Sequence, residues 1–142
     1  MSDIIWIPCQ TGRIWVSRLQ PGSDLRKEIQ RWAAENMIEA SVILSAVGSL
    51  STVAIRLAGA HSTFVDSRPW ELLSLQGTVN SASIHLHITV ADNQGHTTGG
   101  HLMNGSIVRT TIELAVQEIN GVRFDRDTDP STGFRELQIN RL

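Results

Sequence analysis

Strict alternation of apolar and polar residues from residue 84 to residue 90 is the feature that most limits how this chain can fold. His85 and His87 are among the polar members of this run. A period of two indicates a half-buried β-strand, so both imidazoles lie on one face, roughly 6.5–7 Å apart along the strand. The strand therefore needs a covering layer on its apolar side only.

Residues 93–95, Asn-Gln-Gly, follow this strand as a predicted three-residue hairpin loop. If Asp92 pairs with His96 across the loop, His87 faces His101 on the returning strand. Directly opposed Cβ atoms on one face lie about 4.5–5.5 Å apart. A one-residue slip, or a bulge at the two glycines before His101, would turn that ring away. Otherwise the register predicts three converging imidazoles: His85, His87 and His101.

Length and composition favour one globular domain. The 142 residues are 41% hydrophobic and 18% charged, and a net charge of −2 gives no general attraction to phosphate or anionic lipid. We expect an N-terminal arm at residues 1–12 and a single domain at residues 13–142. The chain has no apolar run of membrane-spanning length and no signal-like start, and its only cysteine, Cys9, fits a reducing compartment. These features predict a cytoplasmic protein without a membrane partner.

The order of the predicted elements indicates an α+β fold. A helix at residues 25–36, capped by Ser23 or Asp24, has apolar residues spaced by three and four. Gly48 to Ser51 is predicted to be a turn, and residues 59–69 and 125–133 are predicted loops. The strands are expected at residues 13–19, 41–47, 52–58, 70–79, 84–90, 107–119, 122–124 and 134–139. Together they predict an α/β sandwich-like domain: a largely antiparallel sheet covered by one main helix, with the histidines on the other face.

Three convergent imidazoles point to metal chemistry. Neutral imidazole is the commonest protein ligand for metals, and three ring nitrogens supply most of a tetrahedral zinc shell. The alternative is a hydrogen-bonded polar cluster at a subunit interface, and a site shared between protomers also stays open. Glu113 is a candidate to orient a ligand imidazole, or it forms an ion pair with Arg109 on the same face. His61 and His96 are expected to be solvated.

The histidine hairpin also carries a family resemblance. The residues that carry it are 85–92, Gly95, 99–102, Gly105, Val108, 110–111 and Glu113, with 48–50 and 70–73 upstream. Their combined spacing resembles the plants-and-prokaryotes conserved (PPC) domain, which occurs alone in bacteria and archaea and beside AT-hooks in plant nuclear proteins. The resemblance covers residues 13–139.

The resemblance implies a homotrimer and an association with DNA or transcription. It also implies a partner-contact element, which plant members write as Gly-Arg-Phe-Glu-Ile-Leu. Residues 68–73 are the altered version here, so Arg68, Trp70 and Glu71 are the candidate partner contacts. The chain has no Arg-Gly-Arg-Pro hook of the plant type.

The residue patterns and the family resemblance leave two functions open. The first is a homotrimeric regulatory or interaction module, associated with DNA or a DNA-bound protein and carrying a three-histidine zinc site. Direct DNA binding needs clustered basic residues, but the chain has one lysine and scattered arginines, of which trimerisation could gather Arg56, Arg68 or Arg123. The alternative is a zinc-dependent hydrolase or lyase, for which Glu113 is the nearest candidate base and no phosphate loop or nucleophile elbow is found.

Overall fold

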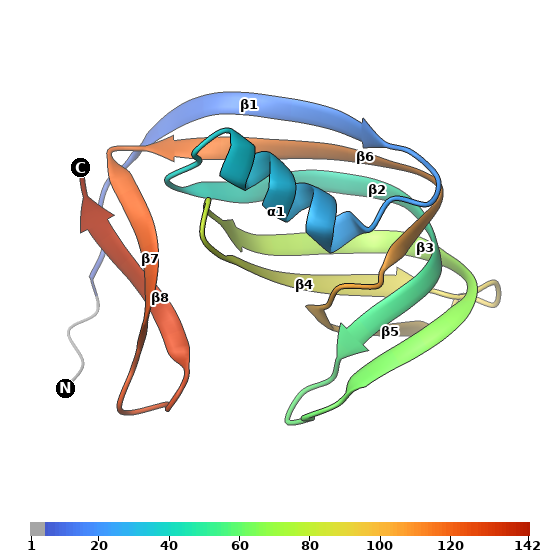
Figure 1. Cartoon of the computed structure of the whole chain (residues 1–142). Coiled ribbons are helices and arrows are strands. Elements are labelled where there is room, and N and C mark those ends of the chain that lie inside the picture. Colours follow the sequence, from blue (N-terminus) through green and yellow to red (C-terminus); the bar gives the residue numbers. More distant parts are fainter. Residues whose placement is uncertain (1–4) are drawn as a thin grey trace.

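The computed structural model describes residues 5–142, so the first four residues of the expected N-terminal arm lie outside the described part. This part of the chain has one helix and eight strands. The strands form a six-stranded sheet, in the order β1-β6-β2-β3-β4-β5, and a separate two-stranded sheet, β7-β8 (Figure 1). The elements are β1 (Gln10–Leu19), α1 (Leu25–Glu35), β2 (Ser41–Arg56), β3 (Thr63–Val79), β4 (Ile84–Ala91), β5 (Thr97–Leu102), β6 (Ile107–Asn120), β7 (Val122–Thr128) and β8 (Arg135–Arg141).

All the strand pairs of the large sheet are antiparallel, which confirms the α+β prediction in its main features. The far end of β2 also pairs with β5, so that the sheet curls back on itself. The helix is short and lies over one face of the curled sheet (Figure 1). The apolar side chains of the sheet turn toward this helix, and the histidine strand therefore exposes its polar side.

The predicted apolar face and the predicted N-terminal cap of α1 are both present. Leu25, Ile29 and Ala33 are buried against the sheet, which gives the expected spacing of four residues. Asp24 caps the helix by accepting a hydrogen bond from the Lys27 amide. Its other carboxylate oxygen accepts from the Gly105 amide at 2.7 Å, so the cap also ties α1 to the loop before β6. None of the helices in residues 5–142 is long and apolar enough to cross a membrane.

The predicted turn at residues 48–51 is wrong, because β2 runs without interruption from Ser41 to Arg56. Gly48 has φ +149°, and a Cβ there would meet the Thr111 carbonyl oxygen at 1.9 Å. Register shifts on either side of Leu50 accommodate a sharp bend within the strand. Glycine and bulges thus curve one long strand where the sequence suggested a turn between two.

Three other boundaries differ from the prediction. β1 begins at Gln10, inside the expected arm, and a bulge between Thr11 and Ile14 restores its register with β6. β3 begins at Thr63 and includes Pro69, which falls at a register shift where a missing amide is tolerated. β7 continues to Thr128, through residues expected to be a loop.

Candidate metal centre

The hairpin of β4 and β5 has the predicted register. His87 lies opposite His101, and the Asp92 amide donates to the His96 carbonyl at 2.9 Å. Gly95 has φ +82°, as a loop of this kind requires. The Asp92 carboxylate accepts hydrogen bonds from two backbone amides of the loop, which lowers the pKa of Asp92. The turn is therefore fixed by its own residues, and with it the pairing of the histidines.

Close backbone packing around the histidines depends on glycine. The pairing of β4 with β5 is continuous through the two glycines before His101, so the bulge that would turn this ring away does not form. A Cβ on Gly100 would meet the Arg56 carbonyl oxygen at 2.6 Å, and a Cβ on Gly77 would meet the His85 carbonyl oxygen at 1.9 Å. These two glycines allow β2 and β3 to approach the hairpin from its two edges.

The three imidazoles lie close enough together to share an ion. Each ring offers one nitrogen, and these nitrogens all lie within 4.8 Å of one another. The ring centroids of His85 are 5.1 Å from His87 and 5.2 Å from His101. In a tetrahedral zinc site with bonds of about 2.0–2.1 Å, ligand nitrogens lie roughly 3.3 Å apart, so a side-chain adjustment of an ångström or two would close the cluster.

The surroundings of two of these rings favour the neutral form over the protonated one. Burial, reinforced by the charge of Arg126, lowers the pKa of His85. Burial, reinforced by the charge of Arg56, lowers the pKa of His101. No hydrogen bond within residues 5–142 occupies a nitrogen of His85, His87 or His101. Neutral imidazoles with unoccupied nitrogens fit the donor set of a divalent transition metal.

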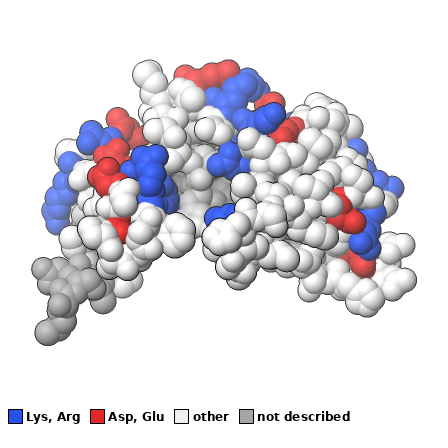
Figure 2. Space-filling view, turned by 60° about the horizontal axis from the view of Figure 1, so that its bottom comes forward, with Lys and Arg blue, Asp and Glu red and all other residues white. Residues whose placement is uncertain are grey.

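A cavity opens beside two of the three histidines, His85 and His101. It measures about 660 Å³ and lies between the histidine hairpin and the β7-β8 hairpin. Figure 2 shows the molecule hollowed between these two parts, with Lys and Arg side chains reaching into the hollow. The Arg126 guanidinium from β7 donates a hydrogen bond to the Thr78 hydroxyl at 3.0 Å. Thr78 lies on β3, directly opposite His85 of β4.

Glu113 is not brought to the histidines. It is exposed on β6 and pairs with Val47 of β2, nine residues before Arg56, which pairs with His101. Nine residues of strand span roughly 30 Å, so Glu113 cannot hydrogen bond to a ligand imidazole. No ion pair within the described residues joins Glu113 to Arg109 either. The alternation of β6 was predicted correctly, but the strand order that separates β6 from β4 was not.

The candidate partner-contact residues have different environments. The Trp70 side chain is only 4% exposed and belongs to the core, so it has no surface to offer a partner. Arg68 and Glu71 are exposed. Arg68 forms an ion pair with Asp66 at 2.5 Å, and its guanidinium lies 5.0 Å from the centroid of the Trp70 ring. These contacts explain Arg68 and Trp70 as local structure.

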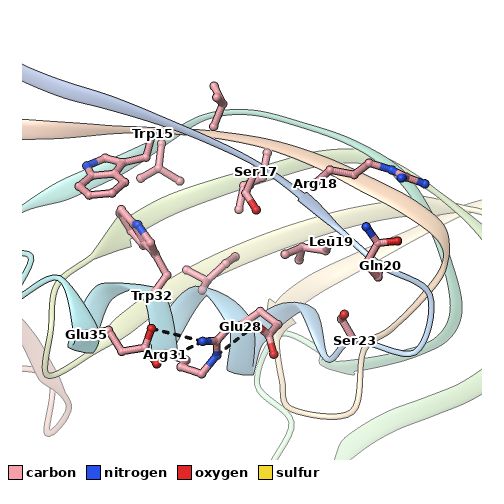
Figure 3. Close-up of a pocket in the computed structure, with 14 residues that line it drawn as sticks. Trp15, Ser17, Arg18, Leu19, Gln20, Ser23, Glu28, Arg31, Trp32 and Glu35 are labelled. Atoms are coloured by element: carbon pink, nitrogen blue, oxygen red, sulfur yellow. Dashed lines mark hydrogen bonds and ion pairs between the residues drawn. The ribbon is translucent and has the colours of Figure 1, made fainter.

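A second cavity, of about 360 Å³, lies between β1 and α1 (Figure 3). Its charged groups largely satisfy each other, since Arg31 is paired with Glu28 and with Glu35, the latter at 3.1 Å. Trp15 and Trp32 meet edge to face at one end, with centroids 5.6 Å apart. None of the three clustered histidines lines this cavity, which therefore is the weaker candidate site.

Three further residues near the histidines are not indicated by the sequence pattern. Arg56 is the β2 neighbour of His101 through a pairing between strands that are distant in sequence. Arg126 and Glu136 come from the β7-β8 hairpin, and both line the same cavity as His85. Local patterns carry no signal for these approaches, because they depend on how the sheet curls and where the small hairpin lies. His61, expected to be solvated, is exposed but also lines this cavity.

Comparison with known proteins gives consistent matches. The family model of the Plants and Prokaryotes Conserved (PCC) domain matches residues 7–120. The chain is 42% identical, over 95% of its length, to the bifunctional protein GlmU of Synechococcus sp. (strain JA-3-3Ab). It covers only 22% of that protein and 20% of its counterpart in a second Synechococcus strain, about a fifth of the length of these curated relatives.

Solved structures share the whole fold. A hypothetical protein from Salmonella enterica is 34% identical with a TM-score of 0.92, and the match covers 95% of this chain and 97% of that one. The metal-containing protein AF0104 from Archaeoglobus fulgidus is 25% identical with a TM-score of 0.78, over 95% and 99% of the two chains. A Bacteroides thetaiotaomicron protein described as a candidate DNA-binding protein is 20% identical with a TM-score of 0.77, over 92% and 96%, and shows the fold alone.

Proposed function

Because the chain belongs to the Plants and Prokaryotes Conserved domain family and carries three clustered histidines on its β4-β5 hairpin, we propose that it is a metal-binding module. His85, His87 and His101 would hold one divalent ion, and zinc is the expected metal. The observation that carries the proposal is the set of three ring nitrogens within 4.8 Å of one another. The bound ion would supply Lewis acidity and a coordination position beyond the three imidazoles.

The donor set supports a transition metal over a hard cation. Three neutral nitrogens suit Zn²⁺ and its neighbours, whereas Mg²⁺ and Ca²⁺ prefer oxygen ligands. A relative of the same fold, from Archaeoglobus fulgidus, is described as metal-containing, which adds independent support. The hydrogen-bonded polar cluster is less favoured, because no hydrogen bond within the described residues links the three rings.

Cobalt substitution tests the proposal directly. Metal-free protein titrated with Co²⁺ is expected to develop visible ligand-field bands that saturate at one ion per chain. The His87→Ala variant is expected to lose these bands, whereas His96→Ala, whose side chain is 77% exposed in the hairpin turn, keeps them. Identical spectra for His87→Ala and the unmodified protein would contradict the proposed ligand set.

Self-association into the homotrimer implied by the family is also part of this proposal. Ile14, Val16 and Val47 are 60%, 79% and 54% exposed, and the first two alternate along β1 with Trp15, whose ring meets Trp32 of α1. Register places Val16, Ala115 and Ser45 side by side on the neighbouring strands β1, β6 and β2. Large exposed apolar side chains, such as these three, are typical of a surface that another protomer covers.

Association with DNA is the second candidate function, and the structural neighbour described as a candidate DNA-binding protein supports it. Basic and acidic side chains are interspersed over the face seen in Figure 2 outside the hollow, so contact through a DNA-bound protein fits better than direct binding. A gel-shift series from low to moderate salt, with a pull-down from the same extract, tests this. The absence of both a shift at low salt and a DNA-bound partner would exclude this function.

A zinc-dependent enzyme is the alternative to a regulatory module. Glu113, the base expected from the sequence, is too far away, and Glu136 is the acidic residue that shares the cavity with His85 and His101. The cavity gives this alternative room for a small substrate. Turnover that disappears in both His87→Ala and Glu136→Gln would favour the enzyme.

A further inference from the structure

The cavity beside the histidines is unusual in its charge. Among residues 5–142, four arginines line it, from α1, β2, β7 and β8, against a single acidic side chain, Glu136. The four are Arg26, Arg56, Arg126 and Arg135. This lining has a local surplus of positive charge, although the net charge of the chain is −2.

None of these four arginines has a carboxylate partner within 4 Å among residues 5–142. The ion-paired arginines lie elsewhere in the chain, at positions 13, 31, 68 and 123. Arg26 donates to the amide oxygens of Gln30 and Asn104, and Arg126 to the Thr78 hydroxyl and a backbone carbonyl. Arg56 is a half-buried residue, and its side chain makes no hydrogen bond within the described residues. Half-buried cations without a counter-charge are costly unless an anion is bound.

Two of these cations flank the histidines from different sides. Arg56 adjoins His101 through the pairing of β2 with β5. Arg126 is held by Thr78, the cross-strand neighbour of His85. A ligand lying between the two guanidiniums would therefore also lie beside the three imidazoles.

We propose that this cavity binds the oxyanion group, phosphate or carboxylate, of a small organic molecule between Arg56 and Arg126, beside the metal ion. Guanidinium groups form strong, geometrically matched hydrogen bonds with both kinds of oxyanion. The volume of about 660 Å³ is in the range of small-molecule sites. The proposal deepens the metal-binding function and rests on it, because the ion would add positive charge at the same place.

Anion titration calorimetry tests the proposal, with inorganic phosphate and succinate as the two probes. Zinc-loaded protein is expected to bind at least one of the probes at one site per chain, and the stronger probe identifies the oxyanion. Arg56→Gln and Arg126→Gln are each expected to raise its dissociation constant about tenfold or more, since each removes charge-assisted hydrogen bonds. Arg109→Gln, an exposed β6 residue outside the cavity, should change it less than twofold.

Folding and metal binding are checked separately on the same variants. Because Arg126 anchors the β7-β8 hairpin, its variant is compared by thermal melting, and Arg56→Gln serves as the variant without a contact to lose. Both should keep one zinc per chain. Retained zinc with unchanged anion affinity overturns the anion site alone. Absent zinc with anion binding that still depends on Arg56 overturns the metal centre alone.

A macromolecular phosphate is the competing source of the same chemistry. A concave cavity favours a small molecule over a DNA backbone, which needs an open surface. Duplex DNA of 20 base pairs is therefore expected not to displace the bound probe. Displacement by DNA at low micromolar concentration, lost in Arg56→Gln, would overturn the small-molecule assignment.

Discussion

His87 and His101 face each other across β4 and β5, with ring centroids 4.5 Å apart and ring planes at 85°. This pairing is made by a hairpin with a three-residue loop, and His85 joins it from the same strand face, two residues before His87. Little of the remaining chain is needed to bring the three rings together. What the rest of the fold adds is the approach of β2 and β3 from either side.

Gly77 allows the approach of β3, and replacing it tests that role. Gly77→Ala would place a Cβ 1.9 Å from the His85 carbonyl oxygen at a φ of +144°. We expect a loss of about 1–3 kcal/mol in the free energy of unfolding and weaker zinc binding, because β4 must shift. Urea denaturation and zinc titration measure the two effects.

Gly59→Ala is the matched control for this change. Gly59 also has a positive φ, +68°, but a Cβ there meets nothing within 4 Å. It should cost less stability and leave zinc affinity unchanged. Equal effects at both positions would show that backbone conformation alone, and not the contact with His85, explains the result.

The lowered pKa values of His85 and His101 predict a stability change with pH in the metal-free protein. Unfolded histidine takes up a proton near pH 6.5, and the folded rings do so only at lower pH. Below about pH 6.5 the unfolded state therefore binds more protons, so the free energy of unfolding falls as the pH falls. Thermal melting of chelator-treated protein from pH 7.5 to 5.5 should show a decreasing midpoint.

The double variant His85→Gln, His101→Gln identifies the source of this dependence. It should have a clearly flatter midpoint over the same pH range. A slope identical to that of the unmodified protein would assign the effect to other groups.

Asp24 links the helix to the loop before β6, and removing its carboxylate should release both. Asp24→Ala loses the bonds from the Lys27 and Gly105 amides. We expect about 1–2 kcal/mol of destabilisation, at the upper end of the range for helix caps. Ser23, the other cap suggested by the sequence, makes no side-chain hydrogen bond in the described chain. The Ser23→Ala variant should therefore change stability little.

The proposed trimer should be disrupted by a charge at Val16, the most exposed of the apolar residues on β1. Light scattering should give three times the 15.6 kDa chain mass for the unmodified protein and a smaller mass for Val16→Glu. Met37→Glu, equally exposed at 79% but at the end of α1, should remain a trimer. A monomer mass for the unmodified protein would exclude the trimer altogether.

Short-range sequence patterns predicted the elements whose structure depends on residues close together in the sequence. The helix, its cap and the histidine hairpin each depend on residues a few positions apart, and each was found where the alternation or spacing placed it. The resemblance to the Plants and Prokaryotes Conserved domain was likewise confirmed by the family match over residues 7–120.

Contacts between residues that are distant in sequence could not be predicted from these short-range patterns. Gly48 indicates a turn by its residue type, yet here it allows β2 to bend while pressed against the Thr111 carbonyl. Glu113 has the right alternation for a residue facing the histidines, but strand order removes it. Arg56 and Arg126 reach the cavity only through the curl of the sheet and the position of β7-β8. Such contacts follow from tertiary topology, which alternation does not encode.

Elemental analysis of the protein, purified without chelator and reconstituted with one equivalent of Zn²⁺ before gel filtration, tests the metal centre most directly. The account predicts close to one zinc per chain in the unmodified protein and in His96→Ala, and less than about a tenth of that in His101→Ala, because two remaining imidazoles bind the ion far more weakly. Zinc retained equally by His101→Ala, or absent from the unmodified protein, would contradict it.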